Sequence, residues 1–264
     1  MKPVDEERLA KTLGKIRKVR RMSERDQDVS IFLFNGLVIY SGGSKRIPVK
    51  MRSPKTEELF AFLICKGTAS RAEIVEALWP CLETEKAMHN LNTHLYYIRK
   101  SFGSESPSFI EIGRNEIKLD GSRFYCDLYD FEKISRQIRM EGVSDRSLIE
   151  QAEQLYNGPL FNARDYHWLH DFASHYEQTY IRILEAAAQF SISESSYDEA
   201  LRYYDVILKL DGLREDIAEA VIRLCLSLGR NAEAMKYYQR LESSLLQELG
   251  TEPDPTIRKL LTKT

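Results

Sequence analysis

The stretch TEKAMHNLNTHLYYIRKSF, residues 84–102, decides how the rest of the chain is interpreted. Leu91, Leu95, Ile98 and Phe102 recur at steps of three and four residues, the spacing of side chains that stack along one side of an α-helix. We therefore expect a helix over residues 84–102 that buries this apolar stripe against its own protein.

The side of this helix opposite the stripe contains no carboxylate. At about 100° per residue it collects aromatic, basic and hydrogen-bonding groups, namely His89, Thr93, Tyr96 and Lys100, with Lys86 and Tyr97 beside them. Solvated helix faces usually mix Glu with Lys, so a face without carboxylates is suited to binding a polyanion. An ordinary surface helix is the alternative, and the helix by itself does not decide between the two.

The composition is that of a globular protein with room for two domains. The chain has 264 residues, 43% of them hydrophobic, which suffices for a core in each domain. No run approaches the roughly 18 apolar residues of a membrane span, and the charged N-terminus lacks a hydrophobic signal core. The four cysteines have neither zinc-site spacing nor the density of a disulfide scaffold. We therefore expect a cytoplasmic protein.

The overall charge of −2 conceals two regions of opposite sign. Residues 1–126 carry 22 Lys and Arg against 16 Asp and Glu, a net of +6, and the remainder carries 16 against 24, a net of −8. The asymmetry suggests two tasks, with polyanion binding confined to the first region.

The N-terminal residues 4–20 have the pattern of an amphipathic helix, and residues 22–28 are polar and look like a linker. The pair Lys2-Pro3 resembles the end of a response-regulator receiver domain, where a Lys-Pro pair closes the last strand before the last helix. The resemblance implies that residues 1–21 are the remnant of a receiver's final helix, and no phosphorylation site can be carried over from it. A natural N-terminal helix is the alternative.

Residues 29–119 alternate between strand and helix signals. Residues 29–49 are rich in β-formers interrupted by turns at Asn35-Gly36 and Gly42-Gly43, and the latter lacks the spacing of a phosphate loop. Pro54 opens a helix that Gly67 ends, and Ser70 with Glu73 forms a capping box for the next helix. After the helix at residues 84–102, the segments 109–112 and 117–119 predict a β-hairpin with the basic tip Gly113-Arg114-Asn115-Glu116.

This order of elements resembles the OmpR/PhoB-type winged helix, in the version found in SARP-like bacterial activators. Ala77-Leu78-Trp79-Pro80 before the third helix and Ile98-Arg99-Lys100-Ser101-Phe102-Gly103 at its end carry the resemblance. It implies a winged-helix DNA-binding domain over residues 29–126, with the third helix in the major groove and the hairpin wing at the adjacent minor groove. The loop 80–83 corresponds to the family's polymerase-facing segment.

The resemblance also implies a set of DNA contacts. Base contacts are expected from Asn92, Thr93, Tyr96 and Tyr97. Many relatives place arginines where this helix has tyrosines, so hydroxyl or apolar contacts, such as Thr93 to a thymine methyl, become more plausible than guanine readout by arginine. Phosphate or groove contacts are expected from Lys86, His89, Arg99, Lys100 and Arg114.

The second half is helical throughout, over segments 127–140, 145–156 and 166–193 and an internal repeat. YDEALRYYDVI (197–207) recurs as NAEAMKYYQRL (231–241), a shift of 34 residues, which is the tetratricopeptide period. Most of the repeat's tyrosines are interpreted as core packing. The segment LYNGPL (155–160), Trp168, the repeats and LGTEPDP (249–255) together resemble the bacterial transcriptional activator domain, which is expected over residues 127–264.

One cluster suggests a metal site as a minor alternative. His167, His170, Asp171 and His175 lie along one helical side and could ligate a divalent cation, although a histidine-studded packing face is the more natural interpretation. The sequence shows no nucleophile elbow, phosphate loop or H-E-x-x-H motif, so we expect no enzyme activity and no cofactor.

The expected fold is therefore an α+β winged helix followed by an all-α tetratricopeptide-like domain. The expected function is a sequence-specific transcriptional regulator, the output region of a two-component response regulator. Its partners would be double-stranded DNA, bound as a homodimer, and RNA polymerase, with no membrane. The alternative is a protein-interaction adaptor whose winged helix docks protein rather than DNA.

Overall fold

The structure is a computed structural model that describes residues 28–103, 109–143, 145–162 and 164–262. It divides into two compact units. Unit 1 is the described part of Met1–Lys133 together with Glu153–Glu177, and unit 2 is that of Ile134–Ala152 together with Gln178–Thr264. The helix expected within residues 1–21 and all but the last residue of the expected linker lie outside the described residues.

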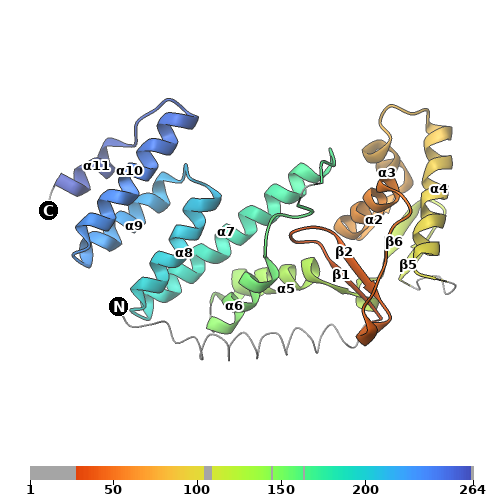
Figure 1. Ribbon diagram of the computed structural model, residues 1–264, viewed down its shortest axis with the longest axis horizontal. Coiled ribbons are helices and arrows are strands. Elements are labelled where there is room, and N and C mark those ends of the chain that lie inside the picture. The colour runs from red at the N-terminus through yellow and green to blue at the C-terminus, as the bar shows by residue number, and fades with distance from the viewer. Residues whose placement is uncertain (1–27, 104–108, 144, 163, 263–264) are drawn as a thin grey trace. The chain divides into compact units, whose positions relative to one another are not determined.

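Unit 1 begins with a four-stranded sheet of order β3-β2-β1-β7 (Figure 1). Its strands are β1 (Val29–Phe32), β2 (Val38–Ser41), β3 (Ile47–Pro48) and β7 (Tyr125–Cys126). β1 runs antiparallel to β2 and parallel to β7. Asn35 and Gly36 turn the chain between β1 and β2 with φ values of 61° and 122°, which confirms the expected Asn-Gly turn. A short 3-10 turn, η1 (Gly43–Lys45), connects β2 to β3.

Three helices follow, at the positions that the sequence predicts. They are α2 (Pro54–Lys66), α3 (Arg71–Leu78) and α4 (Thr84–Ser101). Pro54 occupies the first turn of α2 and Gly67 ends it with φ 68°. The capping box of α3 is confirmed, because Glu73 N donates to Ser70 Oγ (3.1 Å) and Ser70 N donates to the Glu73 carboxylate (3.0 Å).

A second, three-stranded antiparallel sheet completes this region. It has the order β4-β6-β5, with β4 (Thr68–Ser70), β5 (Ile110–Ile112) and β6 (Glu116–Leu119). β5 and β6 form the expected hairpin, whereas the short strand β4 was not predicted. Three helices with a terminal hairpin fit a winged helix. The 3-10 turn η2 (Gly121–Arg123) then leads to β7.

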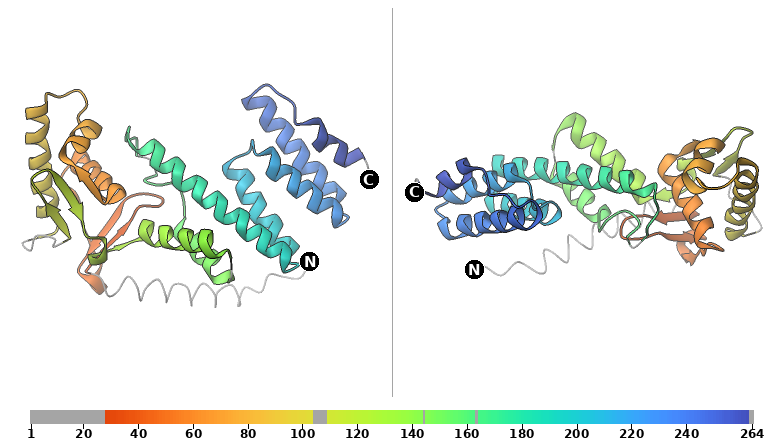
Figure 2. Two further views of the ribbon diagram at one scale, coloured as in Figure 1. Left: turned by 180° about the vertical axis from the view of Figure 1, so that it is seen from behind. Right: turned by 90° about the horizontal axis from the view of Figure 1, so that it is seen from above.

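The rest of the described chain is helical. Its helices are α5 (Asp127–Glu141), α6 (Arg146–Leu155), α7 (Leu169–Ser193), α8 (Tyr197–Leu210), α9 (Glu215–Ser227), α10 (Asn231–Glu248) and α11 (Pro255–Thr262). α9 packs against both α8 and α10, and α11 packs against α9 and α10. The left view of Figure 2 shows these helices, in blue, grouped at the C-terminal end of the chain. No helix among the described residues combines the length and the apolar composition needed to cross a membrane.

The repeated helices α8 and α10 bury equivalent positions. Ala200, Tyr203 and Tyr204 are at most 2% exposed, and Ala234 and Tyr238 are also buried. The interpretation of these tyrosines as core residues is therefore confirmed at three of the four positions, and Tyr237 is half-buried. Assignment of the repeat to the tetratricopeptide class stays a prediction.

Residues 157–176, which the sequence-based division places in the helical domain, pack within unit 1. Asn35 N donates to Pro159 O and Phe161 N donates to Leu33 O, both at 2.9 Å, so this segment extends the first hairpin. The indole of Trp168 lies edge-on to the Phe62 ring of α2, with 5.1 Å between centroids. The winged-helix region thus has part of its apolar surface covered by chain that follows α5 and α6.

Candidate nucleic-acid interface

Helix α4 buries one side as expected. Leu91, Leu95 and Ile98 are at most 3% exposed, which confirms the predicted stripe. Phe102 follows the last helical residue and is half-buried, with its ring centroid 5.7 Å from that of Phe60. α4 thereby packs against α2 and α3, and its opposite side is turned away from the core.

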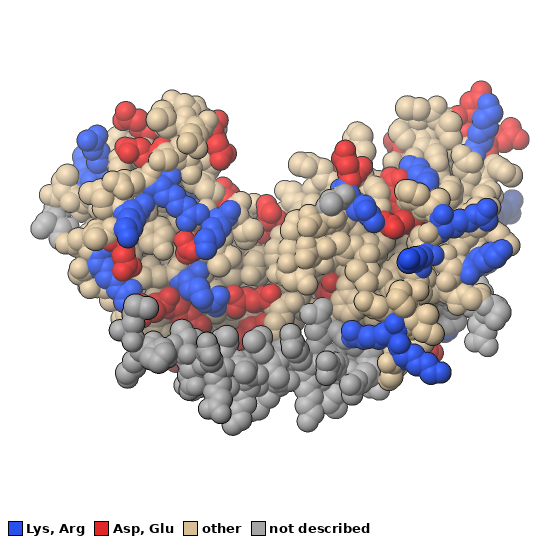
Figure 3. Space-filling view, in the orientation of Figure 1, with Lys and Arg blue, Asp and Glu red and all other residues tan. Residues whose placement is uncertain are grey.

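The outward side of α4 presents the predicted residue types. His89, Asn92, Tyr96 and Lys100 are exposed, and Thr93 is half-exposed. Beyond the first turn the helix carries no Asp or Glu, and its last turn holds Arg99 and Lys100. Figure 3 shows acidic and basic side chains together at the N-terminal end of α4 and mainly basic side chains on the neighbouring surface of unit 1. The exposed side is therefore basic and hydrogen-bonding.

Several of these side chains already have partners. The Thr93 hydroxyl donates to His89 O (3.0 Å), and Lys86 forms an exposed ion pair with Glu83 (2.8 Å). Tyr96, 58% exposed, has the Lys100 ammonium 6.0 Å from its ring centroid. Each of these groups remains at the surface, where an exposed ion pair such as that of Lys86 contributes little stability.

Two predicted contacts are more enclosed than the sequence suggests. The Tyr97 ring is half-buried and lies beneath the Arg52 guanidinium, 4.1 Å from the ring centroid. Arg99 is half-buried, and within the described residues its Nε has no hydrogen-bond partner. Arg52, which the sequence analysis did not single out, adds an exposed cation at the edge of the α4 surface.

The wing lies beside α4 and is joined to it by Arg71, the first residue of α3. Arg71 Nη1 donates to Asn92 Oδ1 (2.9 Å), and Nε and Nη2 both donate to Gly113 O (3.4 Å each). Arg114 is exposed at the tip of the wing, as predicted. Arg71 was not predicted, because the pairing joins positions 21 and 42 residues apart that no local pattern connects.

A second unpredicted group lies at the buried edge of α4. His94 Nδ1 and Thr56 Oγ1 share a hydrogen bond (2.9 Å), and the imidazole stacks on Trp79 with centroids 5.7 Å apart. Burial, and then the positive charge of Lys55, lower the pKa of His94. The lowered pKa favours the neutral imidazole, which links the start of α2 to α4.

The loop between α3 and α4 is exposed. Pro80, Cys81 and Leu82 all lie at the surface, with Leu82 42% exposed. This is the segment for which the winged-helix resemblance implies polymerase contact.

The candidate metal ligands do not assemble into a site. His167, His170, Asp171 and His175 are all exposed. Among the residues that the structure describes, no group of three or more His, Cys, Asp or Glu side chains is arranged to hold a metal ion.

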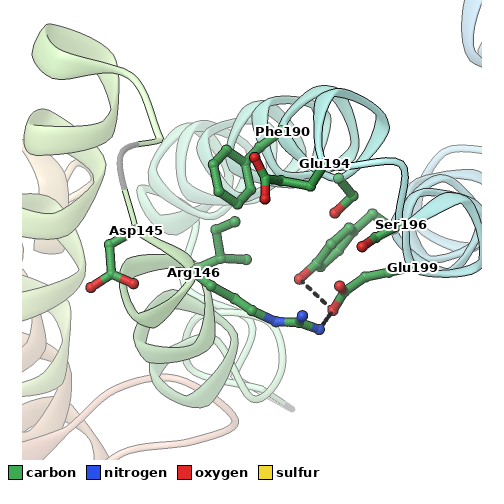
Figure 4. A pocket seen from close by; sticks show the side chains of 9 residues that line it. Asp145, Arg146, Phe190, Glu194, Ser196 and Glu199 are labelled. Atoms are coloured by element: carbon green, nitrogen blue, oxygen red, sulfur yellow. Dashed lines mark hydrogen bonds and ion pairs between the residues drawn. The ribbon is translucent and has the colours of Figure 1, made fainter.

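Unit 2 contains a polar pocket of about 270 Å³ (Figure 4). It is lined by Asp145, Arg146, Ile149, Phe190, Ser191, Glu194, Ser196, Glu199 and Tyr203. Within it Arg146 forms an ion pair with Glu199, and the Tyr203 hydroxyl donates to Glu199 (3.5 Å). Arg146 and Glu199 thus neutralise one another, and the lining does not indicate a particular ligand.

The fold defines a protein with a winged helix followed by a helical domain. The outward side of α4 gives the winged helix a basic surface. A family model described as "Bacterial transcriptional activator domain" matches residues 126–263. The chain therefore belongs to the family of proteins that contain this domain.

Individual relatives are similar over most of the chain. The regulatory protein AfsR of Streptomyces coelicolor is 24% identical over 217 residues, which are 79% of this chain and 22% of AfsR. The transcriptional regulatory protein MoaR1 of Mycobacterium tuberculosis is 22% identical over 223 residues, 80% of this chain and 72% of MoaR1. The chain thus spans about a fifth of the length of AfsR. Both relatives are regulators, in agreement with the expectation that the chain is no enzyme.

A solved structure shows the same fold. Mycobacterium tuberculosis EmbR, determined in complex with a low-affinity phosphopeptide, superimposes with a TM-score of 0.69 at 19% identity. The superposition covers 90% of this chain and 65% of the EmbR chain. At this identity the likeness establishes the architecture, a winged helix followed by a helical domain.

Proposed function

We propose that this protein is a DNA-binding transcriptional activator whose α4 reads base pairs in the major groove while the β5–β6 wing lies at the adjacent minor groove. The observation that carries the proposal is the outward side of α4, which is exposed, basic and free of carboxylates beyond its first turn. Phosphates repel carboxylates and attract Lys and Arg, so such a surface favours DNA over a mixed-charge protein partner.

The proposed base contacts are Asn92, Thr93, Tyr96 and Tyr97, and the proposed phosphate or groove contacts are Lys86, His89, Arg99, Lys100 and Arg114. Arg52 joins the second group, because its guanidinium is exposed beside Tyr97. Each phosphate neutralised steepens the salt dependence of binding by about 0.9 log unit per log unit of salt. A handful of contacts therefore makes binding strongly salt-dependent.

The proposals about the roles of the two domains rest on the resemblance to the winged helix and on the match to the activator-domain family. They assign DNA binding to an OmpR/PhoB-type winged helix at residues 29–126 and activation to residues 127–264, with tetratricopeptide-like repeats for self-association or polymerase contact. Binding as a homodimer and a role as the output region of a two-component response regulator are part of the same proposal. The relatives AfsR and MoaR1, a regulatory protein and a transcriptional regulatory protein by name, support its general form.

A gel shift with the promoter of the protein's own operon tests the proposal. We expect a salt-sensitive complex with the whole chain, lost or strongly weakened when Thr93 and Tyr96 are both changed to alanine. The matched control changes His170 and His175, which are exposed on α7, to alanine and should leave the complex intact. Binding that is unaffected by the α4 changes, or absent for every DNA offered, would favour a protein-docking winged helix instead.

A further inference from the structure

Arg71, at the start of α3, lies at the junction of α4 and the wing, the two elements that form the proposed DNA surface. Its backbone N–H donates to Asn115 O in the wing turn (2.9 Å), so the start of α3 is fixed to the wing. Its side chain then extends to α4, where Nη1 donates to Asn92 Oδ1 (2.9 Å). Nε and Nη2 converge on Gly113 O of the wing (3.4 Å each).

The chemistry of this contact fixes the orientation of the Asn92 amide. A guanidinium has donors and no acceptor, so the atom that faces Arg71 must be the amide oxygen. The Nδ2 group keeps its two N–H donors, and within the described residues it has no partner. An amide oxygen has two lone pairs, and the charge-assisted bond to Arg71 takes one of them and places a positive charge beside the other, which disfavours the approach of a second donor.

This orientation changes which base Asn92 is suited to read. A free asparagine pairs with adenine through both atoms, accepting from N6 and donating to N7. An asparagine with only its N–H groups available matches an edge made of acceptors, which guanine offers at N7 and O6. Cytosine and adenine each present an amino donor that a donor-only amide does not satisfy, and thymine presents a single acceptor, O4, against the two of guanine.

We propose that Arg71 is a positioning residue that sets base specificity by holding Asn92 as a hydrogen-bond donor, so that the protein selects guanine at the base pair Asn92 contacts. The same side chain fixes the spacing between the base-reading helix and the wing, since both bind one guanidinium. This inference rests on the proposed DNA-binding function and adds to it a base preference and the residue that imposes it.

Selection of bound DNA from a random pool, with the whole chain, tests the inference. The base pair in question is the one whose preference disappears in Asn92→Ala. We expect guanine there for the unmodified protein, and a fall of about fivefold or more in the guanine-to-adenine ratio for Arg71→Met, the lower end of the discrimination given by a bidentate base contact. In the Asn92→Ala background, Arg71→Met should leave the base preferences unchanged.

Asn92→Asp provides an independent second variant. It retains an acceptor for Arg71 and removes the donors, so guanine selection should be lost and cytosine, whose N4 donates, should gain. Circular dichroism and thermal unfolding of each variant establish that it is folded, and should Arg71→Met fail to fold, Asn92→Asp decides the question.

Three results would overturn the inference. They are adenine at the Asn92-dependent position in the unmodified protein, guanine retained in Asn92→Asp, or an Arg71→Met variant that weakens all sequences equally and lowers the salt slope by about 0.9, as loss of a phosphate contact would. Failure of the proposed function is distinguishable, because the unmodified protein would then enrich no sequence at all.

Discussion

The hydroxyl of Thr93 donates its proton to the backbone oxygen of His89 (3.0 Å), so it has no donor left for a base, while its methyl group remains available. An apolar contact with a thymine methyl is therefore the contact that the geometry favours. The sequence predicted the residue, and the structure shows which of its atoms faces a hydrogen-bond partner.

We expect Thr93→Val to keep a thymine preference and Thr93→Ser to lose it. Valine retains the methyl and serine does not, and one buried methyl-sized group is worth about 0.8 kcal/mol, or roughly fourfold in affinity. Fluorescence anisotropy with the selected site and its thymine-to-uracil derivative measures the difference. The opposite order, with serine tolerated and valine not, would indicate that the hydroxyl makes the contact.

His94 predicts a pH dependence of stability. Its pKa is lowered in the folded protein from an ordinary value of 6.5, so the unfolded chain binds the proton more readily. The free energy of unfolding should therefore fall as pH drops below about 6.5, and be insensitive to this group above it. Urea denaturation at pH 5.5 and 7.5 should show a smaller pH effect for His94→Gln than for the unmodified protein. An equal pH effect in both would show that other groups cause it.

At the scale of elements, the sequence predicted what depends on local pattern. The stripe of α4, the capping box of α3 and the Asn35-Gly36 turn all appear, since each is specified within a few residues. The strands β4 and β7 were missed because two or three residues are too few to show an alternating pattern.

The part of the candidate site that lies on α4 could also be predicted from local pattern. The outward residues of α4 follow from helix geometry, so His89, Tyr96 and Lys100 are exposed as expected. Arg52 and Arg71 were not predicted, because they reach α4 from segments that only the tertiary fold brings close. Helix periodicity predicts which side of an element faces outward, and it does not predict which neighbour restricts a side chain there.

The first sheet and α5 are joined by one buried carboxylate, Asp127. Its oxygens accept from Leu33 N (2.9 and 3.0 Å), Phe34 N (3.3 Å) and Leu128 N (2.8 Å), and the residue is 1% exposed. It therefore accepts hydrogen bonds from backbone N–H groups just after β1 and at the start of α5. Removing acceptor capacity from such a position leaves buried donors without partners.

Asp127→Asn should destabilise the protein by about 1–3 kcal/mol. The new NH2 group would face backbone N–H donors that now donate to the carboxylate, so these donors would lose their acceptor. Urea denaturation followed by circular dichroism measures the loss. Asp130→Asn on the same helix is the matched control. Asp130 pairs with the exposed Lys133 (3.0 Å), so this change should cost less than about 1 kcal/mol. Equal effects of the two changes would contradict the role assigned to Asp127.

At the scale of the whole molecule, unit 1 contains more than the proposed DNA-binding domain. The Phe34 ring lies 5.1 Å from Tyr156 and 5.2 Å from Phe131, and Phe62 packs on Trp168. All three partners follow residue 126. A chain that ends there exposes these aromatic rings to water, which is unfavourable in proportion to the apolar area uncovered.

We therefore expect a fragment of residues 28–177 to resist urea at clearly higher concentrations than a fragment of residues 28–126. The comparison uses far-ultraviolet circular dichroism, with Trp168→Ala in the longer fragment as an intermediate case. Identical unfolding midpoints for the two fragments would mean that residues 127–177 contribute nothing to the stability of the winged helix.

The central claim, that the outward side of α4 meets DNA bases, is tested most directly by photocrosslinking from position 96. Tyr96 is 58% exposed, so the larger side chain of p-benzoylphenylalanine can replace it without entering the core. The same replacement at Leu246, 61% exposed on α10, is the control. Irradiation of the whole chain with its selected DNA should crosslink position 96, and not position 246, to a base within the site. Position 96 crosslinking only to protein, with bound DNA present, would contradict the account.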